Sequence, residues 1–114
     1  MIEKKEAVEN VEPILEQAKT KGVDMVQWGP ADYSVSMGNP KFFHSDSIHK
    51  VEENVIQKCL EYRIAPRIEI GDVDQAQRYI DLGVRHFCIG WDRFILQSGL
   101  MKLGDGLRKL TDSI

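Results

Sequence analysis

Two acidic residues, Glu3 and Asp32, each follow the end of a short apolar run, about one strand–helix unit apart. In a parallel α/β barrel the carboxyl ends of the strands meet on one rim, so side chains distant in sequence can share one ion. Two carboxylates at such a rim favour a hard cation such as Mg²⁺ or Mn²⁺. The pattern therefore predicts a divalent metal site. The alternative interpretation makes Glu3 a solvated residue at a helix start and Asp32 the cap of a short turn.

The residues after the second apolar run form a turn: Gly29, Pro30, Ala31 and Asp32. Backbone N–H groups at the opening of a short helix suit an anion, because the first N–H groups of a helix lack internal partners. Glycine and proline are also ordinary turn residues. The two interpretations are compatible, since the turn is what presents the amides.

Strand and helical periodicity alternate along the whole chain. Strands are predicted at the tail formed by residues 1–2, and at 24–28, 65–70 and 85–89. Helices are predicted over 7–18 with a new start near Pro13, from an N-cap at Asp46 or Ser47 to residue 62, over 73–82, and over a final segment with leucines at 96, 100, 103, 107 and 110. Residues 29–43 are predicted to form a long loop. Segments 22–29 and 83–90 resemble each other 61 positions apart, the length of two strand–helix units.

This order predicts an α/β fold whose parallel strands alternate with helices through right-handed crossovers. Four such units cannot close an eight-stranded barrel, which takes roughly 250 residues, whereas the chain has 114. We therefore expect residues 1–114 to form a single partial (β/α)8 barrel domain, either a fragment or a half that pairs with another half. The alternative is a small open sheet that is stable on its own.

The composition is that of an ordinary globular domain, with 42% hydrophobic residues, 29% charged residues and a net charge of −3. Acidic and basic residues are interspersed, so no basic stripe exists to bind nucleic acid. The apolar runs are far shorter than the ~20 residues that cross a bilayer, and we expect no signal peptide. Cys59 and Cys88 lie in apolar patterns without metal-ligand spacing, which favours buried reduced thiols and a cytoplasmic protein.

Several motifs resemble the HpcH/HpaI family of metal-dependent class II aldolases, which act on 2-keto-3-deoxy sugar acids and 4-hydroxy-2-oxo acids. They are the segment 1–10 beginning Met1-Ile2-Glu3, the triplet Gly22-Val23-Asp24, the stretch Gly29-Pro30-Ala31-Asp32-Tyr33-Ser34, and the tail from Tyr79 to Asp92. The resemblance covers nearly the whole chain, but only the C-terminal half of the family's barrel, from the end of strand five through helix eight. It implies the C-terminal half of a (β/α)8 barrel of the pyruvate/phosphoenolpyruvate-binding type.

The resemblance also implies a site. Glu3 and Asp32 would hold Mg²⁺, Mn²⁺ or Co²⁺, and the pyruvate part of a 2-oxo acid would bind at Gly29, Pro30, Ala31 and Asp32, its carboxylate on the amides of Ala31 and Asp32. The ion would stabilise charge that develops when a 4-hydroxy-2-oxo acid breaks into pyruvate and an aldehyde. In the family a histidine with acidic support and an arginine that grips the keto acid come from the N-terminal half, so no catalytic residue is assigned in this chain. Met1 also stands where the family often has glutamine.

We therefore expect a carbon–carbon lyase whose metal-binding half is this chain, with a small-molecule 2-oxo acid as substrate. Its partner would be a second copy in a homo-oligomer or a missing N-terminal half. One alternative is a non-catalytic half-barrel module that needs a partner. Another is a lyase of the citrate lyase β type that acts on acyl-CoA esters.

The remaining polar and aromatic residues have simpler expectations. Arg67 and Glu69 share a strand face and are expected to be a charge pair in the barrel interior or mouth, with a substrate contact as the alternative. Trp28 and Trp91 flank the expected rim, where packing roles are expected, with a place in the pocket lining as the alternative for one of them. A structural role is expected for His86. His49 is expected on the surface, and His44 exposed beside a helix cap.

Overall fold

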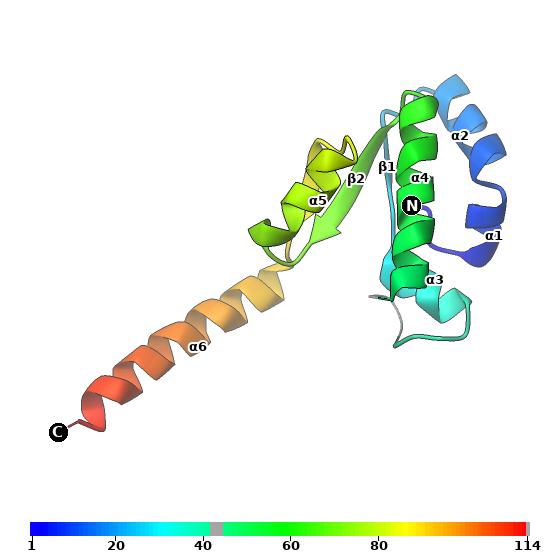
Figure 1. Ribbon diagram of the computed structural model, residues 1–114. Helices are drawn as coiled ribbons and strands as arrows, with labels where there is room; N and C mark the ends of the chain where they lie inside the picture. The colour runs from blue at the N-terminus through cyan, green and yellow to red at the C-terminus, as the bar shows by residue number, and fades with distance from the viewer. Residues whose placement is uncertain (42–44, 114) are drawn as a thin grey trace.

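The computed structural model describes residues 1–41 and 45–113. Its elements, in chain order, are α1 (Lys5–Glu9), α2 (Val11–Thr20), β1 (Met25–Gln27), α3 (Pro30–Ser36), α4 (Asp46–Glu61), β2 (Ala65–Ile70), the 3-10 turn η1 (Val73–Gln75), α5 (Ala76–Asp81), β3 (His86–Ile89) and α6 (Asp92–Thr111). Strands and helices alternate from β1 onward, as the sequence predicts (Figure 1). The predictions for Phe43 and His44 lie outside the described residues.

The three strands form a parallel sheet in the order β1-β2-β3. Gln27 of β1 pairs with Arg67 of β2, and Arg67 pairs with His86 of β3. The chain start extends this sheet, because Ile2 makes a parallel bridge to Trp28. The Ile2 N–H donates to the Gln27 carbonyl at 2.9 Å, and the Gly29 N–H donates to the Ile2 carbonyl at 3.0 Å. Residues 1–2 therefore behave as the predicted strand tail.

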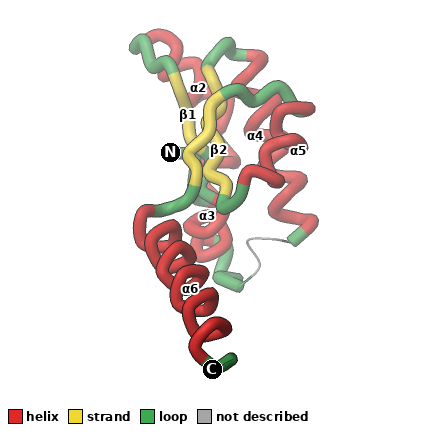
Figure 2. Tube along the Cα trace, turned by 90° about the vertical axis from the view of Figure 1, so that its left-hand side faces the viewer, coloured by secondary structure: helices red, strands yellow, loops and turns green. Residues whose placement is uncertain are grey.

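The two faces of the sheet have different environments. Along β2, Pro66, Ile68 and Ile70 are buried, whereas the alternating Arg67 and Glu69 are only half-buried. The strands lie in front of α4 and α5 in Figure 2, so the helices cover one face and leave the other open. In a closed barrel the open face would point to the interior. We call it the interior face below.

Helix α4 supplies much of the core under the covered face. Its N-cap is Ser45, whose side chain accepts from the Ile48 N–H at 3.5 Å, so the helix begins one residue earlier than the predicted caps. Each fully buried aliphatic side chain stabilises the fold by about 1.5–3 kcal/mol. The core side chains come from the chain start, α2, α4 and all three strand regions: Ile2, Val11, Leu15, Trp28, Tyr33, Ile48, Val55, Ile56, Cys59, Ile64, Ile68, Ile70 and Val84.

Helix α6 stands apart from this body. None of its 20 residues is buried, and it projects from the end of β3, which makes the molecule 65 × 30 × 23 Å (Figure 1). Its leucines are therefore not core residues of this chain, and Gly99, Gly104 and Gly106 do not interrupt the helix. Of the described helices, none has the length and apolar character needed to cross a membrane.

The predicted long loop over residues 29–43 is wrong in its first half. Residues Pro30–Ser36 form helix α3. Proline is well suited to the first helical position, since its fixed φ matches the helix and its missing N–H costs no internal hydrogen bond. The turn at Gly29 thus leads directly into a short helix.

Candidate functional site

A cleft of about 1150 Å³ lies at the carboxyl ends of all three strands. Its walls include Gln27 of β1, Glu69 of β2 and Gly90 just after β3. Loops that follow parallel strands converge at this edge, which is where α/β proteins bind ligands. The cleft continues over the edge to the helical side, where His49 of α4 and Arg78 of α5 line it.

The β1–α3 turn forms one wall of the cleft. All four predicted substrate-binding residues line it: Gly29, Pro30, Ala31 and Asp32. The Tyr33 N–H donates to the Gly29 carbonyl at 3.0 Å and closes the first turn of α3. The N–H groups of Ala31 and Asp32 precede that bond and have no acceptor inside the helix. Trp28 anchors the turn, because it is buried and its ring lies 5.1 Å from that of Tyr33.

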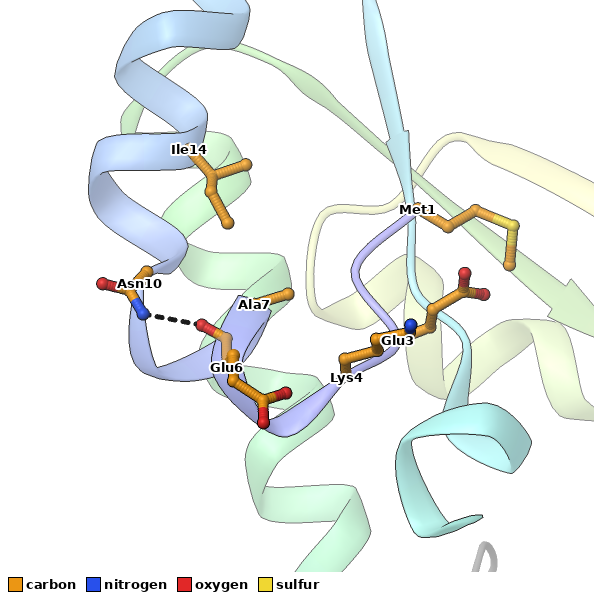
Figure 3. Close-up of a pocket in the computed structure, with 7 residues that line it drawn as sticks. All are labelled: Met1, Glu3, Lys4, Glu6, Ala7, Asn10 and Ile14. Atoms are coloured by element: carbon orange, nitrogen blue, oxygen red, sulfur yellow. Dashed lines mark hydrogen bonds between the residues drawn. The ribbon is translucent and has the colours of Figure 1, made fainter. Parts of the chain in front are cut away.

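Glu3 lies over the start of this turn. A Cβ at Gly29 would lie 2.9 Å from the Glu3 Cβ and 3.2 Å from Glu3 Oε2. Glycine is therefore required at position 29 for the Glu3 side chain to stay where it is. Figure 3 shows the side chains of Met1 and Glu3 extending to the same side, away from Ile14. The strand-like start explains this direction, because Ile2 points into the core and its two neighbours point the other way.

Glu3 and Asp32 approach the same turn from two segments but line different hollows. Asp32 belongs to the cleft, Glu3 to a smaller hollow of about 510 Å³ beside α1 (Figure 3), and Met1 lines both. Within residues 1–41 and 45–113, no group of three or more His, Cys, Asp and Glu side chains is arranged to hold a metal ion. The chemistry of the two carboxylates nevertheless fits a hard cation, and the missing side chain of Gly29 leaves room for the Glu3 side chain beside the turn. That Glu3 and Asp32 share one ion stays a prediction.

A buried carboxylate that the sequence analysis missed lies on the helical side of the cleft. Glu52 of α4 is 3% exposed, and its oxygens accept from the Tyr79 hydroxyl at 3.2 and 3.3 Å. Arg78 Nη2 lies 3.7 Å from the same carboxylate, and Arg78 Nη1 lies 2.7 Å from His49 Nδ1. Burial, and then the charge of Glu52, raise the pKa of Tyr79 to about 12. This cluster joins α4 to α5.

The position of His49 in this cluster corrects a prediction, and the position of Glu52 on α4 is a feature that the sequence could have revealed. His49 is half-buried among these groups, so its expected surface position is wrong. Glu52 lies one turn after Ile48 and one turn before Val55 and Ile56, which places it on the buried face of α4. A charged residue within an apolar helical stripe was therefore the signal for a paired buried carboxylate.

A second polar network lies on the interior face. Arg67 Nη1 donates to Gln27 Oε1, and Gln27 Nε2 donates to Glu69 Oε2 at 3.4 Å. The indole N–H of Trp91 donates to Glu69 Oε1. The predicted charge pair of Arg67 with Glu69 is therefore indirect, because the Gln27 amide lies between the two side chains. Trp91 is 56% exposed and lines the cleft, so the alternative of a pocket-lining tryptophan applies to it in place of the packing role, whereas Trp28 is buried as expected.

The two cysteines are both free thiols. Cys59 is buried in α4 as expected, and burial raises the pKa of its thiol to about 11. Cys88 is only partly buried, because its register partner is Glu69 and it therefore shares the interior face. That position corrects the expectation that both thiols are buried.

Comparisons with known proteins extend this description. A family model described as HpcH/HpaI aldolase/citrate lyase matches residues 1–98. A relative from Klebsiella pneumoniae subsp. pneumoniae, named 4-hydroxy-2-oxo-heptane-1,7-dioate aldolase, is 34% identical over 98 residues, which are 86% of this chain and 36% of the relative. A relative of the same name from Escherichia coli (strain SE11) is 37% identical over 98 residues, 83% of this chain and 35% of the relative. The chain thus spans about a third of the length of these curated relatives.

Two longer solved structures have a similar fold. The crystal structure of citrate synthase SbnG superposes with a TM-score of 0.87 at 22% identity, over 98% of this chain and 44% of that one. An HpcH/HpaI aldolase/citrate lyase family protein from Burkholderia cenocepacia J2315 superposes with a TM-score of 0.82 at 25% identity, over 94% and 40% of the two chains. These similarities confirm the predicted α/β fold with parallel strands, of which this chain is a part.

Proposed function

The chain belongs to the HpcH/HpaI aldolase/citrate lyase family, and we propose that residues 1–114 form the C-terminal half of a (β/α)8 barrel lyase that cleaves a 4-hydroxy-2-oxo acid into pyruvate and an aldehyde. The observation that carries this proposal is the convergence of Glu3 and the turn bearing Asp32 at the carboxyl edge of a parallel sheet. The relatives are named as aldolases of a 4-hydroxy-2-oxo acid, which supports the same reaction class for this chain.

Glu3 and Asp32 are the residues that would hold the divalent cation, with Mg²⁺, Mn²⁺ and Co²⁺ as candidates. Both offer carboxylate oxygens, which hard ions prefer, and Gly29 lets the Glu3 side chain lie against the turn that bears Asp32. When bound, the cation supplies Lewis-acid stabilisation of the negative charge that develops on the keto acid. The two acidic side chains are therefore the first residues to change in a test.

The β1–α3 turn would bind the pyruvate half of the substrate. The N–H groups of Ala31 and Asp32 are the donors that α3 leaves unpaired, and both residues line the cleft. A carboxylate accepts hydrogen bonds from such successive amides. Gly29 and Pro30 set the turn, so the four residues would hold a 2-oxo acid beside the two metal-binding carboxylates.

Two exposed surfaces of this chain would have to be buried by partners in the proposed enzyme: the leucines of α6 and the interior face of the sheet. On α6, Leu100, Leu103 and Leu107 are 61%, 73% and 63% exposed, and an apolar stripe of this kind is typical of an interface. We propose that a second copy covers α6 and that the remaining half of the barrel covers the interior face. A cytoplasmic location stays a prediction from the free thiols of Cys59 and Cys88.

The metal assignment is tested by Mn²⁺ binding, followed by electron paramagnetic resonance, in Glu3→Gln and Asp32→Asn. Each change removes a charged ligand, and we expect affinity to fall by more than about tenfold, since even outer-shell changes cost about 10–100-fold. Glu16→Gln, a charge-matched change on the exposed side of α2, should bind Mn²⁺ normally. Unchanged affinity in the first two variants would contradict the assignment.

The reaction is tested by the release of pyruvate from a 4-hydroxy-2-oxo acid, with and without Mn²⁺. Metal-dependent release that is lost in Glu3→Gln and Asp32→Asn supports the lyase. Metal binding without pyruvate release supports the alternative of a module that needs a partner half. Release of acetyl-CoA or glyoxylate from an acyl-CoA ester would instead favour the citrate lyase type.

A further inference from the structure

The part of the cleft wall formed by β2 contains a carboxylate held in place by two hydrogen bonds. Glu69 accepts from the Trp91 indole N–H on Oε1 and from the Gln27 amide on Oε2, at 3.4 Å for the latter. The Gln27 amide cannot turn over without losing a bond, because its oxygen accepts from Arg67. Arg67 thus fixes Gln27, and Gln27 and Trp91 fix Glu69. Gln27, Glu69 and Trp91 line the cleft, whereas Arg67 is not among its lining residues, so the charge that the network presents to the cleft is negative.

The charges of the cleft are mainly negative. Carboxylates of Asp32, Glu69, Asp72 and Asp74 line it. Arg78, which also lines it, is already paired, because its Nη2 lies 3.0 Å from Glu53 Oε1 and 3.7 Å from Glu52 Oε2. Arg78 is the only lysine or arginine among the described lining residues, so a negatively charged ligand group near Glu69 would meet repulsion that no unpaired lysine or arginine side chain of the lining offsets.

An apolar platform lies next to Glu69. Trp91 and Phe94 stack with ring centroids 5.5 Å apart, and they are 56% and 49% exposed. Ile95 extends this surface, and all three residues line the cleft. The platform can contact the carbon chain of a ligand. The negative charge of Glu69 beside it disfavours a ligand that carries a second negative charge at this place.

We propose that Glu69 and Trp91 form a specificity-determining subsite that accepts an uncharged aldehyde half of the substrate and rejects one that bears a carboxylate. This inference rests on the proposed aldolase function and deepens it. The relatives are named for a 1,7-dioate, a compound with carboxylates at both ends. This chain differs in preference, because a distal carboxylate at Trp91 would lie beside the fixed Glu69.

The charge of the subsite is measured by fluorescence quenching on the chain itself, without catalysis. Of the two tryptophans, Trp28 is 2% exposed, so dissolved quenchers report on Trp91. Relative to its quenching of free N-acetyltryptophanamide, we expect the anion iodide to quench less than the neutral quencher acrylamide or the cation caesium. In Glu69→Gln the iodide-to-acrylamide ratio should rise about two- to fourfold at low salt, since a nearby unit charge is removed.

Asp105→Asn is the matched control, because it removes the same charge from an exposed part of α6. An equal rise in both variants, or no rise in Glu69→Gln, overturns the proposal. The wild-type comparison of iodide with caesium needs no variant. Each quenching constant is divided by its value for free N-acetyltryptophanamide, because the two ions differ in intrinsic efficiency, and equal normalised values also overturn the proposal. Loss of the signal in Trp91→Phe confirms which tryptophan reports.

The substrate preference is measured by the rates of aldol addition of pyruvate to glycolaldehyde and to succinate semialdehyde with Mn²⁺. We expect glycolaldehyde to be preferred, and Glu69→Gln to shift the ratio toward the anionic aldehyde by about tenfold, the factor given by roughly 1.4 kcal/mol. An unchanged ratio overturns the subsite alone. Exchange of the pyruvate methyl protons with solvent tests the proposed function separately, because it needs no aldehyde; its absence removes that function while the quenching result still decides the charge of the subsite.

Discussion

Helices α4 and α6 have comparable amphipathic sequences but opposite environments. In α4, Ile48, Val55, Ile56 and Cys59 are buried under the sheet, whereas no residue of α6 is buried and its leucines are among the most exposed side chains. The periodicity of apolar residues predicts both helices equally well. It does not say which surface covers the apolar side. For α4 that surface is β2, whereas no described residue of this chain buries the apolar side of α6.

The largest expected effect is the difference in unfolding free energy when a large aliphatic side chain is shortened to alanine in each of the two helices. Ile56→Ala in α4 should lower the free energy of unfolding by about 2–5 kcal/mol, because Ile56 is fully buried and a cavity remains. Leu100→Ala in α6 should change it by less than about 0.5 kcal/mol in a monomeric sample. Urea unfolding measures both. Equal losses would mean that α6 folds back onto the body.

The pH dependence of stability should come from the α4 side. The pKa of Cys59 is raised to about 11 and that of Tyr79 to about 12, in both cases first by burial. The unfolded chain releases these protons near their ordinary values of 9.0 and 10.0, so the folded state binds more protons in between. Stability should be full below pH 9 and decline from there to about pH 12. The double change Cys59→Ala with Tyr79→Phe should flatten this decline in urea midpoints, and an unaltered slope would refute the explanation.

A smaller effect is expected at the glycines of α6. No atom within 4 Å would meet a Cβ at Gly99, so Gly99→Ala should stabilise the helix by about 1 kcal/mol through propensity. The helical signal in circular dichroism and the amide exchange of α6 measure this gain. Gly29→Ala is the contrasting control, since its Cβ would meet Glu3 at 2.9 Å and it should weaken Mn²⁺ binding. A loss of helicity in Gly99→Ala would show that α6 needs the glycine for a close contact.

The smallest effect on unfolding, and the most informative on assembly, is expected for Leu103→Lys. Leu103 is 73% exposed, so the change should alter monomer stability by less than about 0.5 kcal/mol. If a second copy covers α6, the same change should reduce the molecular mass measured by light scattering. Lys102→Gln, on the neighbouring exposed position, should leave the mass unchanged. A mass that is unaffected by Leu103→Lys would remove α6 from the proposed interface.

Much of the fold was predictable because it is encoded locally. The predicted strand 65–70 coincides with β2, and the break near Pro13 coincides with the separation of α1 from α2 at Asn10. The helix over 73–82 ends at Gly83, whose φ of +99° is a conformation that glycine adopts readily. Helix α3 was missed although Pro30 is a helix-start signal, because glycine and serine around it also favour a loop.

The site was predictable only in part. The turn residues were found because their types and order are informative in themselves, and they line the cleft as expected. The roles of Glu52 and Gln27 and the hydrogen bond of Trp91 were missed because their partners are far away in sequence. Glu52 bonds to a residue 27 positions away, Gln27 to one 42 away, and Trp91 to one 22 away. Strand register and helix packing bring such pairs together.

By itself, the sequence determined the type and order of the elements except helix α3, the family, and the turn at the carboxyl end of β1. These follow from interactions between residues a few positions apart, which periodicity and turn chemistry express. Only the tertiary structure decided that Glu3 lies over Gly29, that Gln27 separates Arg67 from Glu69, and that α6 has no cover within the described chain. Those outcomes depend on which strands pair and which faces pack, and the energy of such contacts belongs to pairs of distant residues rather than to any local pattern.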